Sequence, residues 1–181
     1  MTRALLISTM LLVIATWIST PRANQQAMAG DSSKANVSEK DQDFVKNAAS
    51  GGMLEVALGR HAAQHGQDQK VRDFGQRMVG DHTRANERLK MIAKDLGIEM
   101  PPQMEREHSE MVEKLMQLHG KEFDSAYMKH MVHDHQEDVS EFQNEADHGG
   151  NRQISEFAKK TLPTLQEHLK MAQETQKSLK S

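Results

Sequence analysis

Four residues that can ligate a metal ion interrupt otherwise apolar stripes of the sequence: Glu55, His82, His135 and His168. The residues at three- and four-residue steps around each of them are mostly apolar or small, which is the pattern of a helix face turned toward a core. Neutral imidazole and carboxylate groups are ordinary ligands of Zn, Fe, Mn and Cu. If the four helices place these residues at one level, they form a site for a single metal ion.

A buried hydrogen-bond network is the alternative interpretation of the same four residues. A single core histidine is more often a hydrogen-bonded structural residue than a metal ligand, and Glu55 could accept hydrogen bonds from the imidazoles. A buried carboxylate and three imidazoles need partners in either case. The number of ligand-type residues and their expected convergence favour the metal, and both interpretations stay open from sequence.

Asp81 and Asp134 each come directly before one of these histidines, His82 or His135. One step along a helix is a rotation of about 100°, so both carboxylates point to the flank of the stripe. There they could accept a hydrogen bond from an imidazole of a neighbouring helix and orient it toward a metal. Carboxylates that face solvent are an equally good interpretation.

Four long helices and one short helix are expected to position these residues. The long helices are predicted at about 41–65, 68–96, 121–147 and 151–177, and the short one at about 105–118. Gly97 and the Pro101-Pro102 pair end the second helix. Each candidate ligand lies near the midpoint of its own long helix, and midpoints share one layer in an antiparallel bundle.

These elements predict an all-α fold, namely an antiparallel four-helix bundle with the short helix in the crossover between the second and third long helices. Composition agrees, because good helix formers are plentiful and no stretch alternates like a β-strand. The pattern aromatic-x-x-x-Met-Val-x-Asp-His occurs twice, beginning at Phe74 and at Tyr127. This repeat indicates two helix pairs related by a pseudo-twofold axis.

The beginning of the chain has the composition of a signal peptide. Arg3 supplies a positive charge, and a nearly unbroken apolar run from Ala4 to Ile18 follows it. Ala27-Met28-Ala29 fits the small-x-small cleavage pattern, so we expect cleavage after Ala29, with Ala23 as the alternative site.

The expected organisation is a signal peptide at 1–29, a flexible lead-in at 30–40 and one bundle domain at 41–178. The apolar run is shorter than the ~20 residues of a transmembrane helix, so we expect a periplasmic or secreted protein without a membrane span after cleavage; an uncleaved anchor is the alternative. The chain has no cysteine, which excludes disulfides and a thiol nucleophile. With 26 acidic and 23 basic residues and no basic stripe, nucleic acid is not an expected partner, and no protein partner can be named.

Six segments of the sequence together resemble one bacterial family. They are Asp43-Phe44-Val45, Gly52-Met53-Leu54-Glu55, Met78-Val79-Gly80-Asp81-His82, Phe123-Asp124-Ser125-Ala126-Tyr127, Met131-Val132-His133-Asp134-His135, and Leu162-Pro163 with His168-Leu169. In combination they resemble the ferritin-like family called domain of unknown function 4142, whose members are often labelled outer-membrane protein. The resemblance covers about residues 41–175. It implies a ferritin-like bundle in the cell envelope but no settled activity.

The sequence differs from the di-iron enzymes that share a ferritin-like fold. Those enzymes carry Glu-x-x-His on two helices, whereas the residues three positions before the candidate histidines are Val79, Val132 and Leu165. A histidine-rich layer with few carboxylates argues against ferroxidase chemistry at two irons. We therefore expect a metal-binding protein that acts in metal handling or envelope stress. A metal-dependent redox or hydrolytic enzyme and a metal-free structural or interaction module are the alternatives.

Overall fold

The structure is a computed structural model that describes residues 37–180. These residues form five helices and no strand: α1 (Glu39–His65), α2 (Gln69–Leu96), α3 (Arg106–Met116), α4 (Gly120–His148) and α5 (Arg152–Ser178). The predicted all-α fold is confirmed, and each helix begins and ends close to its predicted bounds. The predicted signal peptide at 1–29 and residues 30–36 of the predicted lead-in lie outside the described residues. Within the described part, no helix combines the length and apolarity needed to cross a membrane.

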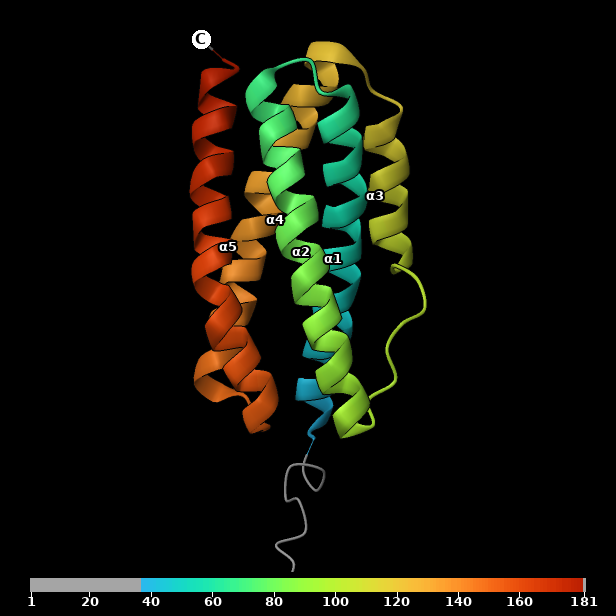
Figure 1. Ribbon diagram of the computed structural model, residues 1–181, viewed down its shortest axis with the longest axis vertical. Coiled ribbons are helices and arrows are strands. Elements are labelled where there is room, and N and C mark those ends of the chain that lie inside the picture. The colour runs from blue at the N-terminus through green and yellow to red at the C-terminus, as the bar shows by residue number, and fades with distance from the viewer. Residues whose placement is uncertain (1–36, 181) are drawn as a thin grey trace, which may run out of the picture. The chain divides into compact units, whose positions relative to one another are not determined.

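Two helical hairpins and one long crossover make up the bundle. α1 pairs with α2, and α4 pairs with α5 (Figure 1). The crossover carries the chain back along the bundle through α3, so α4 runs in the same direction as α2 (Figure 1). α2 also packs beside α5, and α1 beside α4, which makes every neighbouring pair of long helices antiparallel. Two short connections and one long crossover are the connectivity of ferritin-like bundles.

Local sequence signals explain where α1 begins and where α2 ends. The Ser38 hydroxyl accepts the N–H of Asp41 (3.1 Å), and the Asp41 carboxylate accepts the N–H of Ser38 (3.2 Å), which is a capping box. The helix therefore includes Glu39 and Lys40, which belonged to the predicted lead-in. α2 ends at Leu96, because the next residue, Gly97, has a φ of 72° that suits glycine and stops the helix.

α1 and α2 approach each other closely where two glycines meet. A Cβ on Gly59 would lie 2.9 Å from the carbonyl oxygen of Gly75, and a Cβ on Gly75 would lie 2.6 Å from the carbonyl oxygen of Gly59. Neither position therefore accepts a larger residue at this spacing. The crossing lies one helical turn from Glu55 and about two turns from His82, so it fixes the spacing of α1 and α2 near the middle of the bundle.

A polar layer separates the hydrophobic core into two clusters. The first cluster includes Phe44, Val45, Ala49, Leu89, Ala93, Leu96, Phe142, Ile154, Phe157, Leu162 and Leu165. The second includes Leu54, Leu58, Ala62, Val71, Phe74, Met78, Phe123, Tyr127, Met131 and Ala172. On α2, α4 and α5 the candidate histidine falls between the two clusters, and on α1 Glu55 follows the first residue of the second cluster. Apolar packing therefore encloses this layer on both sides.

A buried pair of carboxyl groups joins α4 to the start of α1. Glu145 is 1 % exposed and is hydrogen-bonded to Asp41, whose carboxylate also accepts the N–H of Gly150 (2.9 Å). Burial, followed by the negative charge of Asp41, raises the pKa of Glu145 to about 7. The Glu145 carboxyl group therefore donates a hydrogen to Asp41 below this pH and becomes a second buried negative charge above it.

We predict that Glu145→Gln stabilises the protein at pH 8 and has little effect near pH 5. Because the folded-state pKa is raised from 4.5 to about 7, the protonated carboxyl contributes stability below about pH 4.5 that is lost as the pH rises through 7. The glutamine amide keeps a donor for Asp41 without this loss. Urea unfolding across that pH range should show a gain on the order of 1–3 kcal/mol in the free energy of unfolding, only at the upper end.

Glu137→Gln is the control for this prediction, because Glu137 lies on the same helix with a side chain 71 % exposed. Its stability difference from the wild-type protein should stay small at every pH. A Glu145→Gln effect that does not change with pH would contradict the assignment.

Candidate metal centre

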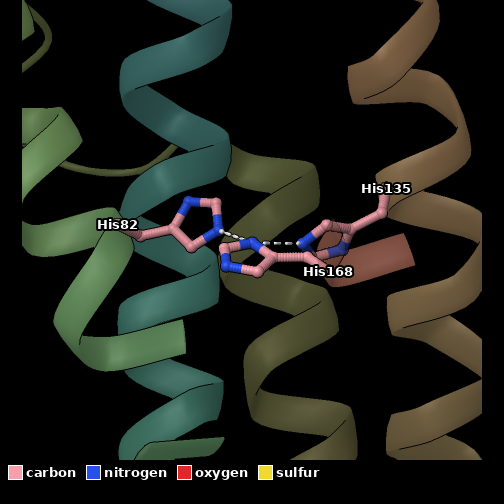
Figure 2. Close-up of side chains that lie close together, drawn as sticks. All are labelled: His82, His135 and His168. Carbon is pink, nitrogen blue, oxygen red and sulfur yellow. Dashed lines mark hydrogen bonds between the residues drawn. The ribbon is translucent and has the colours of Figure 1, made fainter. Parts of the chain in front are cut away.

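The four candidate ligands meet in the middle of the bundle, where we call them the central layer: Glu55, His82, His135 and His168. They come from α1, α2, α4 and α5, and each is at most 5 % exposed. Figure 2 shows the three imidazoles facing one another, and one nitrogen of each ring lies within 4.8 Å of the others. The structure therefore brings together the residues that the apolar stripes singled out.

Four contacts within the central layer close into a loop, which we call the inner ring. His82 Nδ1 lies 2.5 Å from Oε2 of Glu55, and His82 Nε2 lies 3.3 Å from Nδ1 of His168. His135 Nε2 lies 3.4 Å from the same nitrogen of His168 and 3.3 Å from Oε1 of Glu55. The inner ring thus has two imidazole–imidazole and two imidazole–carboxyl contacts around a shared centre.

Two contacts outside the inner ring determine which nitrogens turn a lone pair inward. His168 Nε2 donates to Oδ2 of Asp81 (2.8 Å). Burial opposes ionisation of Asp81, but hydrogen bonds from Arg77 and His168 outweigh it and hold the pKa of Asp81 below its usual value. His135 Nδ1 donates to the carbonyl oxygen of Met131 (3.0 Å), which can only accept. In neutral rings, His168 Nδ1 and His135 Nε2 are therefore lone pairs that face the ring centre.

Burial keeps the imidazoles of the central layer neutral. It lowers the pKa of His82 and of His168 to about 4, and it lowers the pKa of His135 well below the ordinary value. Burial also raises the pKa of Glu55 well above its ordinary value. Since a neutral imidazole is the form that ligates a metal, all three rings are in a ligating state at neutral pH.

Asp138 on α4 lies beside the central layer and was not predicted. It is hydrogen-bonded to Glu55, and one atom each of Asp138, Glu55 and His135 lie within 4.8 Å of one another. A signal for it is present in the sequence, because Asp138 lies three residues after His135 and so shares its helix face. The di-iron motif places its carboxylate three residues before the histidine instead. The layer therefore has more carboxylate around it than the sequence analysis expected.

Asp81 and Asp134, for which the sequence predicted the same role, have different surroundings. Asp81 accepts a hydrogen bond from His168 of the neighbouring helix α5, and it also forms ion pairs with Arg77 and Arg84. Asp134 is half-buried, its Oδ2 has no hydrogen-bond partner among the described residues, and burial raises its pKa well above the ordinary value. Asp81 therefore orients an imidazole of the layer, whereas between residues 37 and 180 no such contact of Asp134 is seen.

The internal repeat brings matching residues together across the bundle. The Phe74 and Tyr127 rings, at the start of the two repeated patterns, meet edge to face with centroids 6.1 Å apart. His82 and His135, at the ends of the patterns, have perpendicular rings with centroids 5.7 Å apart. Since α2 and α4 run in the same direction, equal spacing along both helices places each pair at one level (Figure 1).

Comparison with known proteins identifies the family and the fold. The structure is similar to the crystal structure of a DUF305 fragment from Deinococcus radiodurans, with a TM-score of 0.68 and 13 % sequence identity, covering 78 % of this chain and 98 % of that one. At this identity the likeness shows the fold alone. No curated protein matches the chain. The family described as Domain of unknown function (DUF4142) matches residues 26–175, and the chain belongs to it.

We predict that Asp81→Ala lowers the free energy of unfolding by about 1–3 kcal/mol, because it leaves a buried donor, Nε2–H of His168, without an acceptor. Glu167→Ala is the matched control. Glu167 also forms an ion pair with Arg77, with 3.1 Å between Oε2 of Glu167 and Nη2 of Arg77, but its side chain is 56 % exposed. Its loss should change stability by less than about 0.5 kcal/mol. Urea unfolding in the presence of a chelator measures both effects without any metal contribution, and equal effects would contradict the role given to Asp81.

Proposed function

We propose that this DUF4142 protein binds one divalent transition-metal ion in the central layer and that it acts in metal handling or stress protection in the cell envelope. The observation that carries the proposal is that the inner ring has fewer hydrogens to donate than it has contacts. The hydrogens of neutral His168 and His135 point outward, to Asp81 and to Met131. Only one hydrogen from His82 and at most one from Glu55 remain for the four contacts.

At least two contacts of the inner ring therefore bring lone pair against lone pair inside the core. One of them is always the 3.4 Å contact between His135 Nε2 and His168 Nδ1. In addition, Oε1 of Glu55 is buried and, among residues 37–180, receives no hydrogen bond from an N–H group. Buried acceptors without donors are costly, and a cation at the centre of the ring would satisfy all of them at once.

The spacing of the inward atoms also supports an ion. Ligand atoms about 2.0–2.1 Å from a tetrahedral metal ion lie roughly 3.3–3.4 Å from one another. Three successive contacts have this length: His82 Nε2 to His168 Nδ1 at 3.3 Å, His168 Nδ1 to His135 Nε2 at 3.4 Å, and His135 Nε2 to Glu55 Oε1 at 3.3 Å. These four atoms are the ligands that we propose.

The ligand groups favour one ion over two. The three histidines form one group that could hold an ion, and Glu55, His135 and Asp138 form another. His135 belongs to both groups, but its Nδ1 is engaged with Met131, so only the Nε2 lone pair is available. A single lone pair binds one metal, so the two groups cannot each hold an ion at the same time. Asp138 then holds Glu55 by a hydrogen bond.

The donor set suits Zn, Fe, Mn or Cu in a divalent state. Imidazole suits each of these metals, and the carboxylate of Glu55 adds a negative charge that favours a divalent cation. The signal peptide expected from the sequence would place the site in the periplasm or outside the cell. There the protein would meet metal ions imported from, or released to, the surroundings.

A metal-free structural bundle is the second candidate. It is favoured by a chain of contacts from Asp81 through His168 and His82 to Glu55, with lengths of 2.8, 3.3 and 2.5 Å, each of which can hold one hydrogen. In that arrangement His135 Nε2 still has no donor. The two candidates differ in one respect that can be measured, which is whether folding stability depends on a metal.

Protein purified without a His-tag and stripped by a chelator should bind one ion per chain of at least one of Mn, Fe, Co, Cu or Zn. Because the site exists only in the folded chain, that ion should raise the melting temperature, by about 5–10 °C at a hundredfold excess over its Kd. His135→Ala should abolish both stoichiometric binding and the rise, since His135 Nε2 faces both Glu55 and His168.

His133→Ala is the matched control for this experiment. His133 lies two residues before His135 on α4, and its side chain is 70 % exposed. It should bind and melt like the wild-type protein. If no metal binds stoichiometrically, and neither a strong chelator nor any of the five metals changes the melting temperature, the central layer is structural and the proposal is wrong.

A further inference from the structure

A small cavity lies beside the central layer, inside the bundle. It has a volume of about 20 Å³, and its polar wall includes Glu55, His82 and Asp138. Its apolar wall includes Leu89 and Phe142 of the first core cluster. A water molecule needs about 10–15 Å³ of such space, so the cavity has room for one molecule of that size.

The cavity borders the proposed ion on one side only. Glu55 and His82 line it, whereas the other two histidines of the central layer do not. A ligand in the cavity would therefore approach the ion from the side on which Glu55 and His82 line the cavity, and there it could form a hydrogen bond with Asp138. Metal sites that bind outside ligands leave one position to them, and some expand from four to five ligands, whereas purely structural sites are closed. With four protein ligands, the proposed ion would take the cavity ligand as its fifth.

Asn86 on α2 lies between the cavity and an outer groove. It lines the cavity and also this groove of about 700 Å³, which lies between α1, α2 and the crossover. The Asn86 carboxamide lies against Gly52 of α1, where any Cβ would collide with it. A glycine at this position therefore makes room for Asn86, and a change of the Asn86 rotamer would connect the groove with the cavity.

We infer that the metal ion has an open coordination position that faces this cavity and takes one water-sized ligand from solvent, such as water, hydroxide or fluoride. The inference rests on the proposed metal centre. It makes the centre a site at which a small inorganic molecule binds to the ion, and it excludes larger substrates from the ion because the cavity accommodates only one small molecule.

Fluoride binding to the Co(II)-loaded protein tests the inference. The visible spectrum of Co(II) reports its coordination number, and the relaxation of ¹⁹F reports direct contact of fluoride with the ion. We expect saturable changes in both signals when fluoride is added to the wild-type protein with one Co(II) bound per chain.

Ala85→Val should block this ligand, because Ala85 lines the cavity and two added methyl groups take up its space. This variant should keep one Co(II) per chain and bind fluoride about tenfold more weakly or worse. Ala57→Val is the matched control, since Ala57 lines the outer groove but not the cavity, and it should bind fluoride like the wild-type protein. Ala48→Val, which places the same groups in the cavity from α1, replaces Ala85→Val if that variant does not fold.

The outcomes separate this inference from the proposed function. Co(II) binding without any response to fluoride would overturn the open position and leave the metal centre standing. An equal response in the wild-type protein and in the folded cavity-filling variant would place the fluoride elsewhere and would also overturn it. Failure of the wild-type protein to bind Co(II) or any other of the five metals would overturn both.

Discussion

The structure depends on one constraint, which is the burial of an inner ring that has too few hydrogens to form a hydrogen bond at each of its contacts. Three neutral imidazoles and a carboxyl group face one another in the buried core, and two of the imidazoles, His135 and His168, donate their hydrogens to acceptors outside the inner ring. Neither a shift of tautomer nor protonation of Glu55 supplies a hydrogen to every contact. A polar layer of this kind persists only where the surrounding packing holds it in place or where a cation occupies its centre.

The architecture supplies that packing. Two hydrophobic clusters enclose the layer from both ends of the bundle. The glycine crossing of α1 and α2 sets the distance between two of the helices that carry it. Asp81 of α2, held by Arg77 and Arg84, orients His168 of α5. Such outer contacts are what keeps ligands preorganised at metal sites, and removing them generally weakens a site without removing a ligand.

Periodicity carried most of the information in the sequence. The long apolar stripes located the four helices and the four residues of the central layer, because each ligand interrupts a stripe near the middle of a helix, and antiparallel helices align their middles. The spacing of residues along one helix does not reveal how the neighbouring helices are rotated about their own axes. Asp81 and Asp134 have the same local sequence, yet within residues 37–180 an imidazole of another helix is hydrogen-bonded to Asp81 and none to Oδ2 of Asp134.

Contacts between helices explain the other residues that the sequence did not reveal. Asp138 was overlooked because its carboxylate follows its histidine instead of preceding it. The pairing of Gly52 with Asn86 depends on the distance between α1 and α2, which no local pattern encodes. The cavity likewise arises from how side chains of all four long helices fit together.

Anomalous diffraction from crystals of the metal-loaded protein tests the central claim most directly. The account predicts one anomalous peak per chain inside the bundle, with bonds of about 2.0–2.2 Å to Nε2 of His82, Nδ1 of His168, Nε2 of His135 and Oε1 of Glu55. A peak only at surface groups such as His133, or an unoccupied central layer in protein saturated with each of the five metals, would contradict it.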